Sequence, residues 1–278
     1  MKTVGLINPG AMGSSVGAAA RQAGARVLWA SEGRSPVTTE RAERSGLEDC
    51  QTLQNLVESS DIILSVCPPH SATEVAGDVA ALGFSGIYVE ANAIAPGETR
   101  KIETMITRRG ARLVDGGIIG GPAWKAEYGT QLYLSGEDAS IIAGIFEDTN
   151  LNASVISANI GAASALKMTF AAYTKGTTAL LLAILAVAQS EGVRTHLEKQ
   201  WGEKFTEQTH QRLTANTVKA WRFEGEMQEI AATFDTAGLP PGFHEAAAQV
   251  FAGLAKFKDQ DEIPNIEDVI AALIQPPL

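Results

Sequence analysis

Short apolar runs alternate with turns and helical segments through the first half of the chain. Each run is four or five residues long, and a glycine- or proline-marked turn and a helical pattern follow it. Most runs are apolar at every position, as expected for parallel strands that are buried on both faces. The order predicts a doubly wound α/β sheet with strands at residues 4–7, 26–30, 62–66, 87–90, 111–114 and 131–134.

The second half of the chain has a different pattern, with alanine- and leucine-rich segments and no predicted strand after residue 160. Glycine and proline separate these segments at Gly192, at residues 238–242 and at Pro264, which are helix-stopping signals. A chain of 278 residues is long enough for two ordinary domains. We therefore expect an α/β domain at residues 1–160 and an all-α domain at 161–278, with helices near 161–190, 205–217, 219–236, 243–257 and 266–274.

Composition excludes several classes of protein. With 45% apolar and 19% charged residues, the chain can bury a large core, which rules out a disordered or collagen-like protein. Its 22 basic and 32 acidic side chains give a net charge of −10, which disfavours a nucleic-acid partner. Only two cysteines are present, and neither they nor the four histidines have metal-like spacing, so we expect no metal and no disulfide scaffold.

The first residues and the longest uncharged stretch indicate a cytoplasmic protein without a membrane partner. The first residues lack the separate basic, apolar and cleavage regions of an export signal and are typical of a strand. The longest uncharged stretch lies between Lys175 and Glu191 and is shorter than the ~20 residues that a membrane span needs. We interpret this stretch as a buried helix.

The turn after the first predicted strand has features of a phosphate-binding loop, and it consists of Asn8, Pro9, Gly10, Ala11, Met12 and Gly13. The dinucleotide fingerprint of Rossmann domains needs a tight turn, a bare backbone beside the pyrophosphate and a small residue for helix packing. Gly10 and Gly13 meet the last two needs, and Asn8 occupies the first position, where asparagine tolerates a left-handed conformation. The amino terminus of the next helix would then face the pyrophosphate. The alternative is a purely structural strand-to-helix turn.

The end of the second predicted strand bears on which dinucleotide binds. NAD enzymes usually carry a carboxylate at this strand tip for the ribose hydroxyls, whereas this chain has Ala30 and Ser31 there. Ser31, Arg34 and Ser35 could instead form a pocket for the 2′-phosphate of NADP. Glu32 is the opposing observation, because its carboxylate could accept from a ribose hydroxyl and repel the phosphate. The sequence favours NADP and leaves NAD open.

Four motifs, in order and at suitable spacing, resemble those of the β-hydroxyacid dehydrogenases, which include 3-hydroxyisobutyrate dehydrogenase and relatives of 6-phosphogluconate dehydrogenase. They are the turn at 10–13, the segment 90–96 (family pattern D-x-S-T-x-x-P), the segment 115–121 (D-A-P-V-S-G-G) and the lysine segment 161–167. The resemblance covers nearly the whole chain. It implies a Rossmann domain that binds a nicotinamide cofactor and an all-helical domain, often paired with a second subunit, that completes the substrate cleft.

The chain also departs from the family pattern. Ile119 stands where the family has a serine that contacts the substrate carboxylate, and Ala171 replaces an asparagine four residues after the lysine. Glu226 aligns with a lysine-aspartate pair of a later family helix, in which Gly225 replaces the lysine. These departures resemble a divergent subgroup with an uncharacterised C-terminal helical domain.

Lys167 is the candidate catalytic residue. Hydride transfer to or from a carbonyl carbon needs a group that delivers or removes a proton, and a buried lysine with a lowered pKa can do so. Lys167 lies in an otherwise uncharged stretch, residues 161–170, which is an unusual environment for lysine. The alternative is a lysine whose ammonium reaches solvent from a partly buried helix.

Other residues are weaker candidates for contacts with substrate or cofactor. Asn92 and the pair Cys67 and Pro68 follow predicted strands at the edge where ligands bind, although Asn92 could cap a loop and Cys67 could serve packing. Backbone N–H groups of a glycine pair could bind a carboxylate, although a structural turn would explain it equally. Helical spacing places Thr174 on the side of Lys167, and Lys175 and Glu226 are either site residues or surface charges. The candidates for substrate binding are Asn92, Gly120, Gly121, Trp124, Thr174, Lys175 and Glu226.

The sequence leads to one principal functional hypothesis and two alternatives. The principal one is an NADP-dependent dehydrogenase or reductase that acts on a small hydroxy or oxo compound and uses Lys167 to exchange the proton. One alternative is an imine reductase, and the other is a non-catalytic sensor of NADP(H). The family resemblance and the apolar segment 176–188 favour a homodimer, although a buried helix would explain that segment as well.

Overall fold

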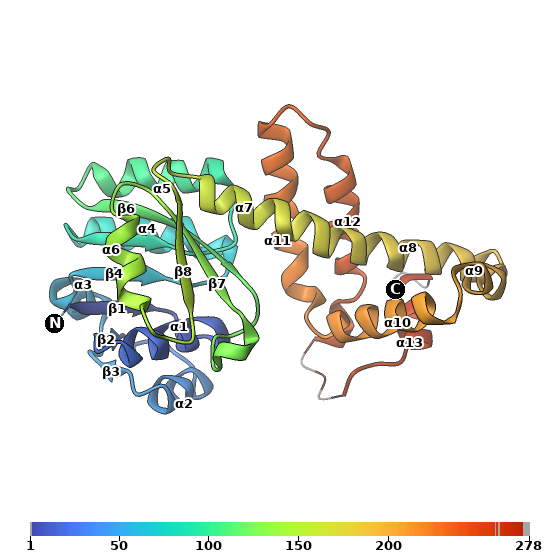
Figure 1. Ribbon diagram of the computed structural model, residues 1–278, viewed down its shortest axis with the longest axis horizontal. Helices are drawn as coiled ribbons and strands as arrows, with labels where there is room; N and C mark the ends of the chain where they lie inside the picture. The colour runs from blue at the N-terminus through green and yellow to red at the C-terminus, as the bar shows by residue number, and fades with distance from the viewer. Residues whose placement is uncertain (1, 259, 261, 275–278) are drawn as a thin grey trace. The chain divides into compact units, whose positions relative to one another are not determined.

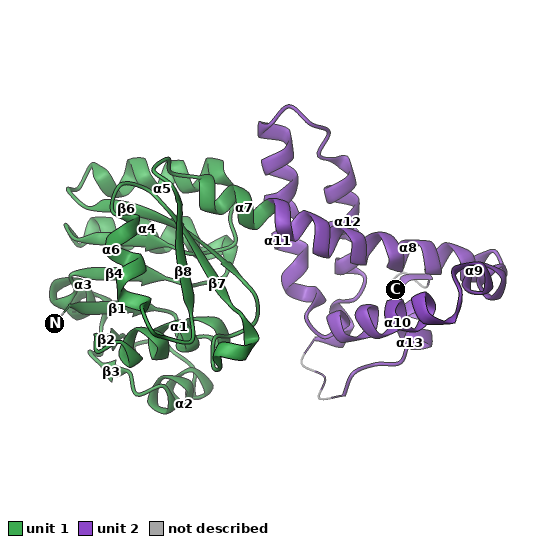
Figure 2. Ribbon diagram, viewed as in Figure 1, with its two compact units in different colours: residues 1–168 green, residues 169–278 purple. Residues whose placement is uncertain are grey.

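The computed structural model describes residues 2–258, 260 and 262–274, and the chain divides into two compact units at residues 1–168 and 169–278 (Figures 1 and 2). The change from α/β to all-α structure follows β8 (Asn152–Ser157), at the start of helix α7 (Ala162–Ala171). The expected boundary at residue 160 lies at this point. The boundary between the compact units lies inside α7 instead, because the first turns of that helix pack against the sheet of the first unit.

The first unit is built on an eight-stranded sheet of order β3-β2-β1-β4-β5-β6-β7-β8. All neighbouring strands are parallel except β6 and β7, and β1 lies between β2 and β4 (Val4 opposite Val27 and Ile62). This order, in which successive strands lie on both sides of β1, is the doubly wound arrangement predicted from the sequence. The strands are Thr3–Ile7 (β1), Arg26–Trp29 (β2), Glu48–Asp49 (β3), Ile62–Ser65 (β4), Ile87–Glu90 (β5), Arg112–Ile119 (β6), Gln131–Ser135 (β7) and β8.

Helices cover both faces of this sheet and form a separate apolar core with each. On one face, side chains of α1, α2 and α6 pack with strand residues such as Val4, Leu6 and Val89. On the other face, α3, α4 and α5 pack against residues such as Ile63 and Tyr88. The alternating burial explains why the strand sequences are apolar at every position. The helices are Ala11–Gln22 (α1), Pro36–Arg44 (α2), Leu53–Ser59 (α3), Ala72–Ala81 (α4), Pro96–Thr107 (α5) and Ala139–Ala143 (α6).

The structure differs from the sequence prediction at the far side of the sheet. β6 continues through Asp115, Gly116 and Gly117 to Ile119, although these residues were expected to form a loop after a strand that ends at residue 114. β7 returns antiparallel to β6, without the expected helix between them. β3 and β8 were not predicted, because their residues are largely exposed and carry no apolar pattern.

The second unit is helical throughout its described residues. A π-helical turn, Ala172–Gly176, joins α7 to α8. Buried side chains of α8, α10, α11, α12 and α13 form the core, among them Leu182, Leu213, Met227, Phe251 and Ile270. The sequence did not predict the π turn or the polar helix α9. The helices are Thr177–Ser190 (α8), Arg194–Trp201 (α9), Glu203–Thr217 (α10), Ala220–Thr236 (α11), Gly242–Ala252 (α12) and Ile266–Ile274 (α13).

One continuous helix, Ala162–Ser190, is the described segment that is long and apolar enough to cross a membrane by length and composition. It has 29 residues, and its most apolar window has a mean hydropathy of 1.6. Core helices of water-soluble proteins can have the same length and composition, so these two properties alone do not indicate a membrane span.

Candidate functional site

The turn between β1 and α1 has the backbone that a dinucleotide-binding loop needs. Asn8 has a φ of 62°, the left-handed conformation that was expected of it. A Cβ at Gly13 would lie 2.6 Å from the carbonyl oxygen of Asn8, so only glycine fits there. A Cβ at Gly10 would meet only that same oxygen, at 4.0 Å. The space beside Gly10 is therefore open on the side where a ligand would approach the backbone.

The amino terminus of α1 opens at this turn. Gly10 is the N-cap residue, and no side chain caps the helix. Ser14 and Ser15 donate their hydroxyl protons to the carbonyl oxygens of Gly10 and Met12, at 2.6 and 2.8 Å, and therefore leave the first N–H groups of the helix unblocked. Ala11 is exposed and Pro9 is buried. Uncapped N–H groups and the helix dipole together favour an anionic group such as a pyrophosphate.

A pocket of about 110 Å³ lies at the carboxyl ends of β1 and β2. Its lining includes Asn8, Ala30, Glu32 and Arg34, so the two side chains with opposite implications for cofactor choice both face it. Ser31 begins a turn that is closed by a hydrogen bond from the N–H of Arg34 to the Ser31 carbonyl oxygen, at 3.0 Å. The Ser35 hydroxyl accepts from the N–H of Thr38 at 3.3 Å and caps α2. Ser35 therefore has a structural role in addition to any contact with a phosphate.

Asn92 ties the ends of β4 and β5 together. Its side-chain oxygen Oδ1 accepts from the N–H of Cys67 at 2.5 Å, and its side-chain nitrogen Nδ2 donates to the Ser65 hydroxyl at 3.0 Å. Its side chain is therefore occupied in holding the loop that begins at Cys67 and Pro68. This is the loop-capping role that the sequence left open.

Buried titratable groups surround this loop. Burial raises the pKa of Glu90 to about 8, with a smaller contribution from the charge of Asp115, although hydrogen bonds from Asn92 oppose the shift. Burial, assisted by Glu90, also raises the pKa of the Cys67 thiol to about 11. A thiol with so high a pKa is a poor nucleophile at neutral pH. Packing is therefore the role that the structure gives Cys67.

The start of α7 is fixed to the sheet through Asp115 of β6. One oxygen of its carboxylate, Oδ2, accepts from the N–H groups of Gly161, Ala163 and Ser164 at 2.9 to 3.1 Å. The other, Oδ1, accepts from the Ser164 hydroxyl at 2.5 Å. Gly117, two residues farther along β6, lets the helix approach closely, because a Cβ there would lie 2.6 Å from the Ala163 carbonyl oxygen.

Lys167 lies one turn beyond these bonds, and its own Cβ is 3.2 Å from the position that a Gly117 Cβ would take. Its side chain is partly buried. Desolvation lowers the pKa of its amine to about 8. The described residues contribute no hydrogen bond or ion pair to this amine. A lysine with a pKa near 8 can both accept and release a proton near neutral pH.

The loop that follows β6 reaches back to α1. The N–H of Ala123 donates to the Ser15 hydroxyl at 2.9 Å. Gly120 has a φ of 125°, which favours glycine, and the Thr130 hydroxyl donates to the Gly121 carbonyl oxygen at 2.7 Å. Trp124 is exposed, and its carbonyl oxygen accepts from Asn150. Within the first unit, the glycine loop is thus attached to the helix that follows the turn at residues 8–13.

The remaining candidates belong to the second unit. Thr174 and Lys175 lie in the π turn, and Lys175 forms a partly buried ion pair with Glu226 of α11. Its ammonium also lies 4.9 Å from the centre of the Phe223 ring. Arg212 of α10 donates to the Thr174 carbonyl oxygen at 2.5 Å and to the Thr178 hydroxyl at 3.0 Å. The structure therefore brings Lys175 and Glu226 together, and Arg212 supplies a donor to a carbonyl oxygen of the π turn.

Comparison with known proteins identifies the first unit. Residues 3–149 match the family described as the NAD binding domain of 6-phosphogluconate dehydrogenase. The chain belongs to this family. Residues 188–254 match a domain of unknown function, DUF1932. An uncharacterised 28.5 kDa protein of Methanothermus fervidus is 31% identical over 203 residues, which are 72% of this chain and 78% of that protein.

Solved structures agree with this family assignment. A conserved protein of unknown function, described as similar to 3-hydroxyacid dehydrogenases, is 28% identical, with a TM-score of 0.66 over 92% of this chain and 97% of that one. The 3-hydroxyisobutyrate dehydrogenase of Mycobacterium tuberculosis is 15% identical, with a TM-score of 0.69 over 98% and 99%. An imine reductase of Myxococcus stipitatus in complex with NADP⁺ is 20% identical, with a TM-score of 0.57 over 98% and 100%. The last two establish a shared fold.

Family membership places the chain among NAD(P)-dependent oxidoreductases and agrees with the open glycine turn at residues 8–13. The turn fits a pyrophosphate because the backbone at Gly10 is bare and the N–H groups of α1 are uncapped. No group of three or more histidine, cysteine or acidic side chains that could hold a metal ion occurs among the described residues.

Two buried acidic residues near the candidate site, Asp115 and Glu90, were not singled out by sequence reasoning. Asp115 was read as part of a loop, because the glycines that follow it are unusual inside a strand. Glu90 carried no signal for its raised pKa, because that property depends on burial by segments distant in sequence. The available signals were their positions at the ends of predicted strands and at the start of the segments 90–96 and 115–121.

Proposed function

We propose that this family member is an NADP-dependent oxidoreductase that transfers a hydride between nicotinamide and a small hydroxy or oxo compound, with Lys167 as the general acid/base. The observation that carries the proposal is the desolvated Lys167 amine, with a pKa of about 8, on a helix bound to the cofactor-binding unit. The nicotinamide, when bound, exchanges a hydride with the substrate carbon. Gly10, Gly13 and the start of α1 would hold the pyrophosphate.

Lys167 is suited to proton exchange in either direction. At a pH near its pKa, comparable fractions of the amine are neutral and charged, so it can accept the hydroxyl proton during oxidation or donate it during reduction. Desolvation of the amine is the cause of its lowered pKa. A positioned acid/base accelerates such a step by about 10²- to 10⁴-fold.

NADPH and NADH titration, followed by a panel of hydroxyacids, aldehydes and imines, tests this function. In Lys167→Ala we expect nucleotide affinity to stay within about threefold, while turnover falls by about 10²- to 10⁴-fold. Lys199→Ala, which changes an exposed lysine of α9, is the matched control and should keep full turnover. Unchanged turnover in Lys167→Ala would contradict the assigned role.

The preference for NADP rests on Arg34. Its guanidinium is exposed at the pocket beyond β2, where a charge-assisted bond to a 2′-phosphate is worth ~1.5–3 kcal/mol. Arg34→Ala should therefore weaken NADPH binding by about 10- to 100-fold and change NADH binding by less than about threefold. Glu32→Gln should strengthen NADPH binding instead. Equal losses for both nucleotides in Arg34→Ala would contradict a phosphate contact.

Imine reduction is the second candidate activity. The imine reductase fold and the absence of the carboxylate-binding serine at Ile119 and of the asparagine at Ala171 favour it. Amine formation from a cyclic imine with NADPH, combined with no activity on hydroxyacids, would support it. A chain that binds NADPH and turns over no compound in the panel would instead be a sensor.

We further propose that the chain forms a homodimer and that it binds a small-molecule substrate. Tyr173, Leu180 and Val187 expose 69%, 45% and 63% of their surface along the π turn and α8, and these apolar side chains support an interface with a second copy of the chain. Light scattering should give twice the mass of one chain. Lys175 and Glu226 would bind substrate only if it replaces one partner of their ion pair.

A further inference from the structure

Asp115 is a completely buried carboxylate whose bonds all lead to the helix that carries Lys167 or to its support. Besides the bonds to residues 161–164, its Oδ2 accepts from the Ser135 hydroxyl of β7 at 2.9 Å. The Ser164 hydroxyl, which is bonded to Oδ1, also lies 2.8 Å from the Thr99 hydroxyl of α5. A single carboxylate therefore joins β6, β7 and the first turn of α7, and Ser164 extends the connection to α5.

The placement of this carboxylate relates it to Lys167 in particular. Asp115 and Gly117 are two residues apart on β6 and so face the same side of the sheet. Gly117 is packed against Ala163 and against the Cβ of Lys167. Lys167 follows the capped turn by about one helical turn, ~5.4 Å along the axis, and helical side chains lean toward the amino terminus. The lysine side chain thus leans toward the end that Asp115 holds.

Two other ionisable groups, Glu90 and Arg100, lie near this end of the helix. Glu90 of β5 interacts with Asp115, and its raised pKa of about 8 keeps it largely protonated at neutral pH. Arg100 of α5 lies beside Gly161, because a Cβ there would meet its guanidinium. The partial positive charge of the α7 amino terminus adds to that of Arg100. The buried carboxylate of Asp115 opposes both of these positive charges.

We propose that Asp115 is a positioning residue for Lys167, whose carboxylate fixes the first turn of α7 and balances the positive end of that helix beneath the lysine. The inference rests on the proposed function of Lys167, and it adds a group that acts on the amine through the helix. Without this negative charge, the helix dipole and Arg100 would act on the ammonium unopposed. The charged form of Lys167 would then be less stable.

The pKa of Lys167 can be measured without any substrate. After reductive methylation with ¹³C-formaldehyde, the NMR shift of each dimethyl-lysine is followed against pH, and Lys167→Arg identifies the Lys167 signal. In Asp115→Asn we expect the pKa of Lys167 to fall by about one unit, the shift that a unit charge within ~10 Å produces at an effective dielectric constant of about 20. Loss of the Asp115 charge would favour the ionised form of Glu90, which could replace that charge. The measurement is therefore repeated with Glu90→Gln added to Asp115→Asn.

Ser135→Ala is the matched control, because it removes a neutral donor from the same Oδ2 and leaves the charge in place. Its Lys167 pKa should stay within about 0.3 units of that of the unchanged protein. A purely structural Asp115 would give equal pKa values in Asp115→Asn and in Ser135→Ala, and that result would overturn the proposal.

A second measurement applies if Asp115→Asn does not fold. Ser164→Ala removes the hydroxyl that holds Oδ1, and amide hydrogen exchange at residues 161–164 should then become at least about tenfold faster than exchange elsewhere in α7. Uniform exchange along the helix would overturn the proposal. Failure of this inference can be told apart from failure of the proposed function. If the Lys167 pKa shifts in Asp115→Asn but the unchanged protein has no turnover, only the proposed function is refuted. If the unchanged protein turns over substrate but the Lys167 pKa does not shift in Asp115→Asn, only the role of Asp115 is refuted.

Discussion

Asn8 adopts the left-handed backbone conformation at the first position of the glycine turn. This conformation costs most L-residues roughly 1–2 kcal/mol, whereas glycine adopts it freely and asparagine more readily than most. We therefore expect Asn8→Ala to lower the melting temperature by about 2–6 °C and Asn8→Gly to leave it nearly unchanged. Calorimetry of both variants measures this difference. Equal melting temperatures would contradict a left-handed residue here.

Lys167 also has a predictable effect on stability. Its pKa is lowered to about 8 in the folded chain, whereas an exposed lysine titrates near 10.5. Between these values the unfolded chain binds more protons, so this group makes the folded state more stable as pH rises through the window from about 8 to 10.5. Below pH 8 the lysine is charged in both states, and its burial destabilises the fold throughout.

Lys167→Met should therefore stabilise the chain at pH 7 by on the order of 1–3 kcal/mol, and the gain should shrink by pH 10. Urea unfolding of the two chains at both pH values measures the difference. Taking the difference removes the opposite contribution of Glu90, which is common to both chains. A gain that does not depend on pH would show that the amine is not desolvated.

Residue-level properties were predictable only where they depend on local backbone or local composition. The conformation of Asn8 followed from its position in the turn, and the low polarity around Lys167 was visible in the ten surrounding residues. The side-chain bonds of Asp115 and Asn92 join segments 20 to 49 residues apart, and no spacing rule indicates which donor will meet which oxygen.

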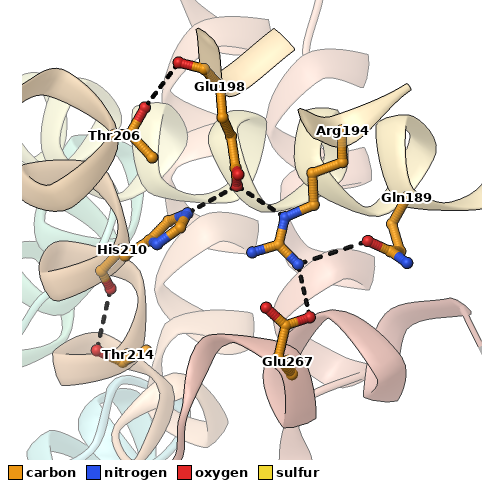
Figure 3. A network of polar contacts seen from close by, with 7 residues as sticks. All are labelled: Gln189, Arg194, Glu198, Thr206, His210, Thr214 and Glu267. Atoms are coloured by element: carbon orange, nitrogen blue, oxygen red, sulfur yellow. Dashed lines mark hydrogen bonds and ion pairs between the residues drawn. The ribbon is translucent and has the colours of Figure 1, made fainter. Parts of the chain in front are cut away.

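At the scale of elements, a network of polar side chains centred on Arg194 joins four helices of the second unit (Figure 3). Arg194 at the start of α9 donates to Glu198 and to Glu267 of α13, each at 2.7 Å, and Glu198 also bonds to His210 of α10 at 3.0 Å. Gln189 of α8 lies 3.5 Å from the same guanidinium. The side chain of Arg194 is 10% exposed, so its charge is compensated mainly by protein groups.

Arg194→Met should destabilise the chain by about 1–3 kcal/mol, because Glu198 would lose its partner in a partly buried position. Arg44→Met is the matched control, since the Arg44 side chain is 81% exposed and its ion pair with Glu40 lies at the surface. The control should change stability by less than about 0.5 kcal/mol. Urea unfolding followed by circular dichroism compares them, and equal effects would contradict the structural role of the network.

Elements with strong apolar periodicity were predicted, and those without it were not. β1, β4 and β5 match their predicted ranges to within one residue at each end, because their residues are buried on both faces. β8 is mostly exposed, and α9 has mainly polar residues, so neither gave a signal. The π turn adds one residue to a helical turn without changing the apolar composition, and no local feature of the sequence predicted it.

At the scale of the whole molecule, the change from strand patterns to helical patterns predicted an α/β part followed by a helical part. The family match over residues 3–149 and the separate match over residues 188–254 agree with that change. The division of the chain inside α7 was not predictable, because it depends on the attachment of the helix to β6 through Asp115 and Gly117. Lys167, the proposed acid/base, therefore belongs to the same compact unit as the cofactor-binding turn.

The affinity of Gly10→Val for NADPH, measured by fluorescence titration, tests most directly whether the turn at residues 8–13 binds the pyrophosphate. The backbone at Gly10 is extended, with φ −70° and ψ −170°, and the space around a Cβ is open, so the fold should tolerate valine and keep its melting temperature. The valine side chain would occupy the space through which the pyrophosphate approaches the turn. We expect at least about tenfold weaker NADPH binding with an unchanged melting temperature. Undiminished binding in a folded Gly10→Val chain would contradict binding of the pyrophosphate at this turn.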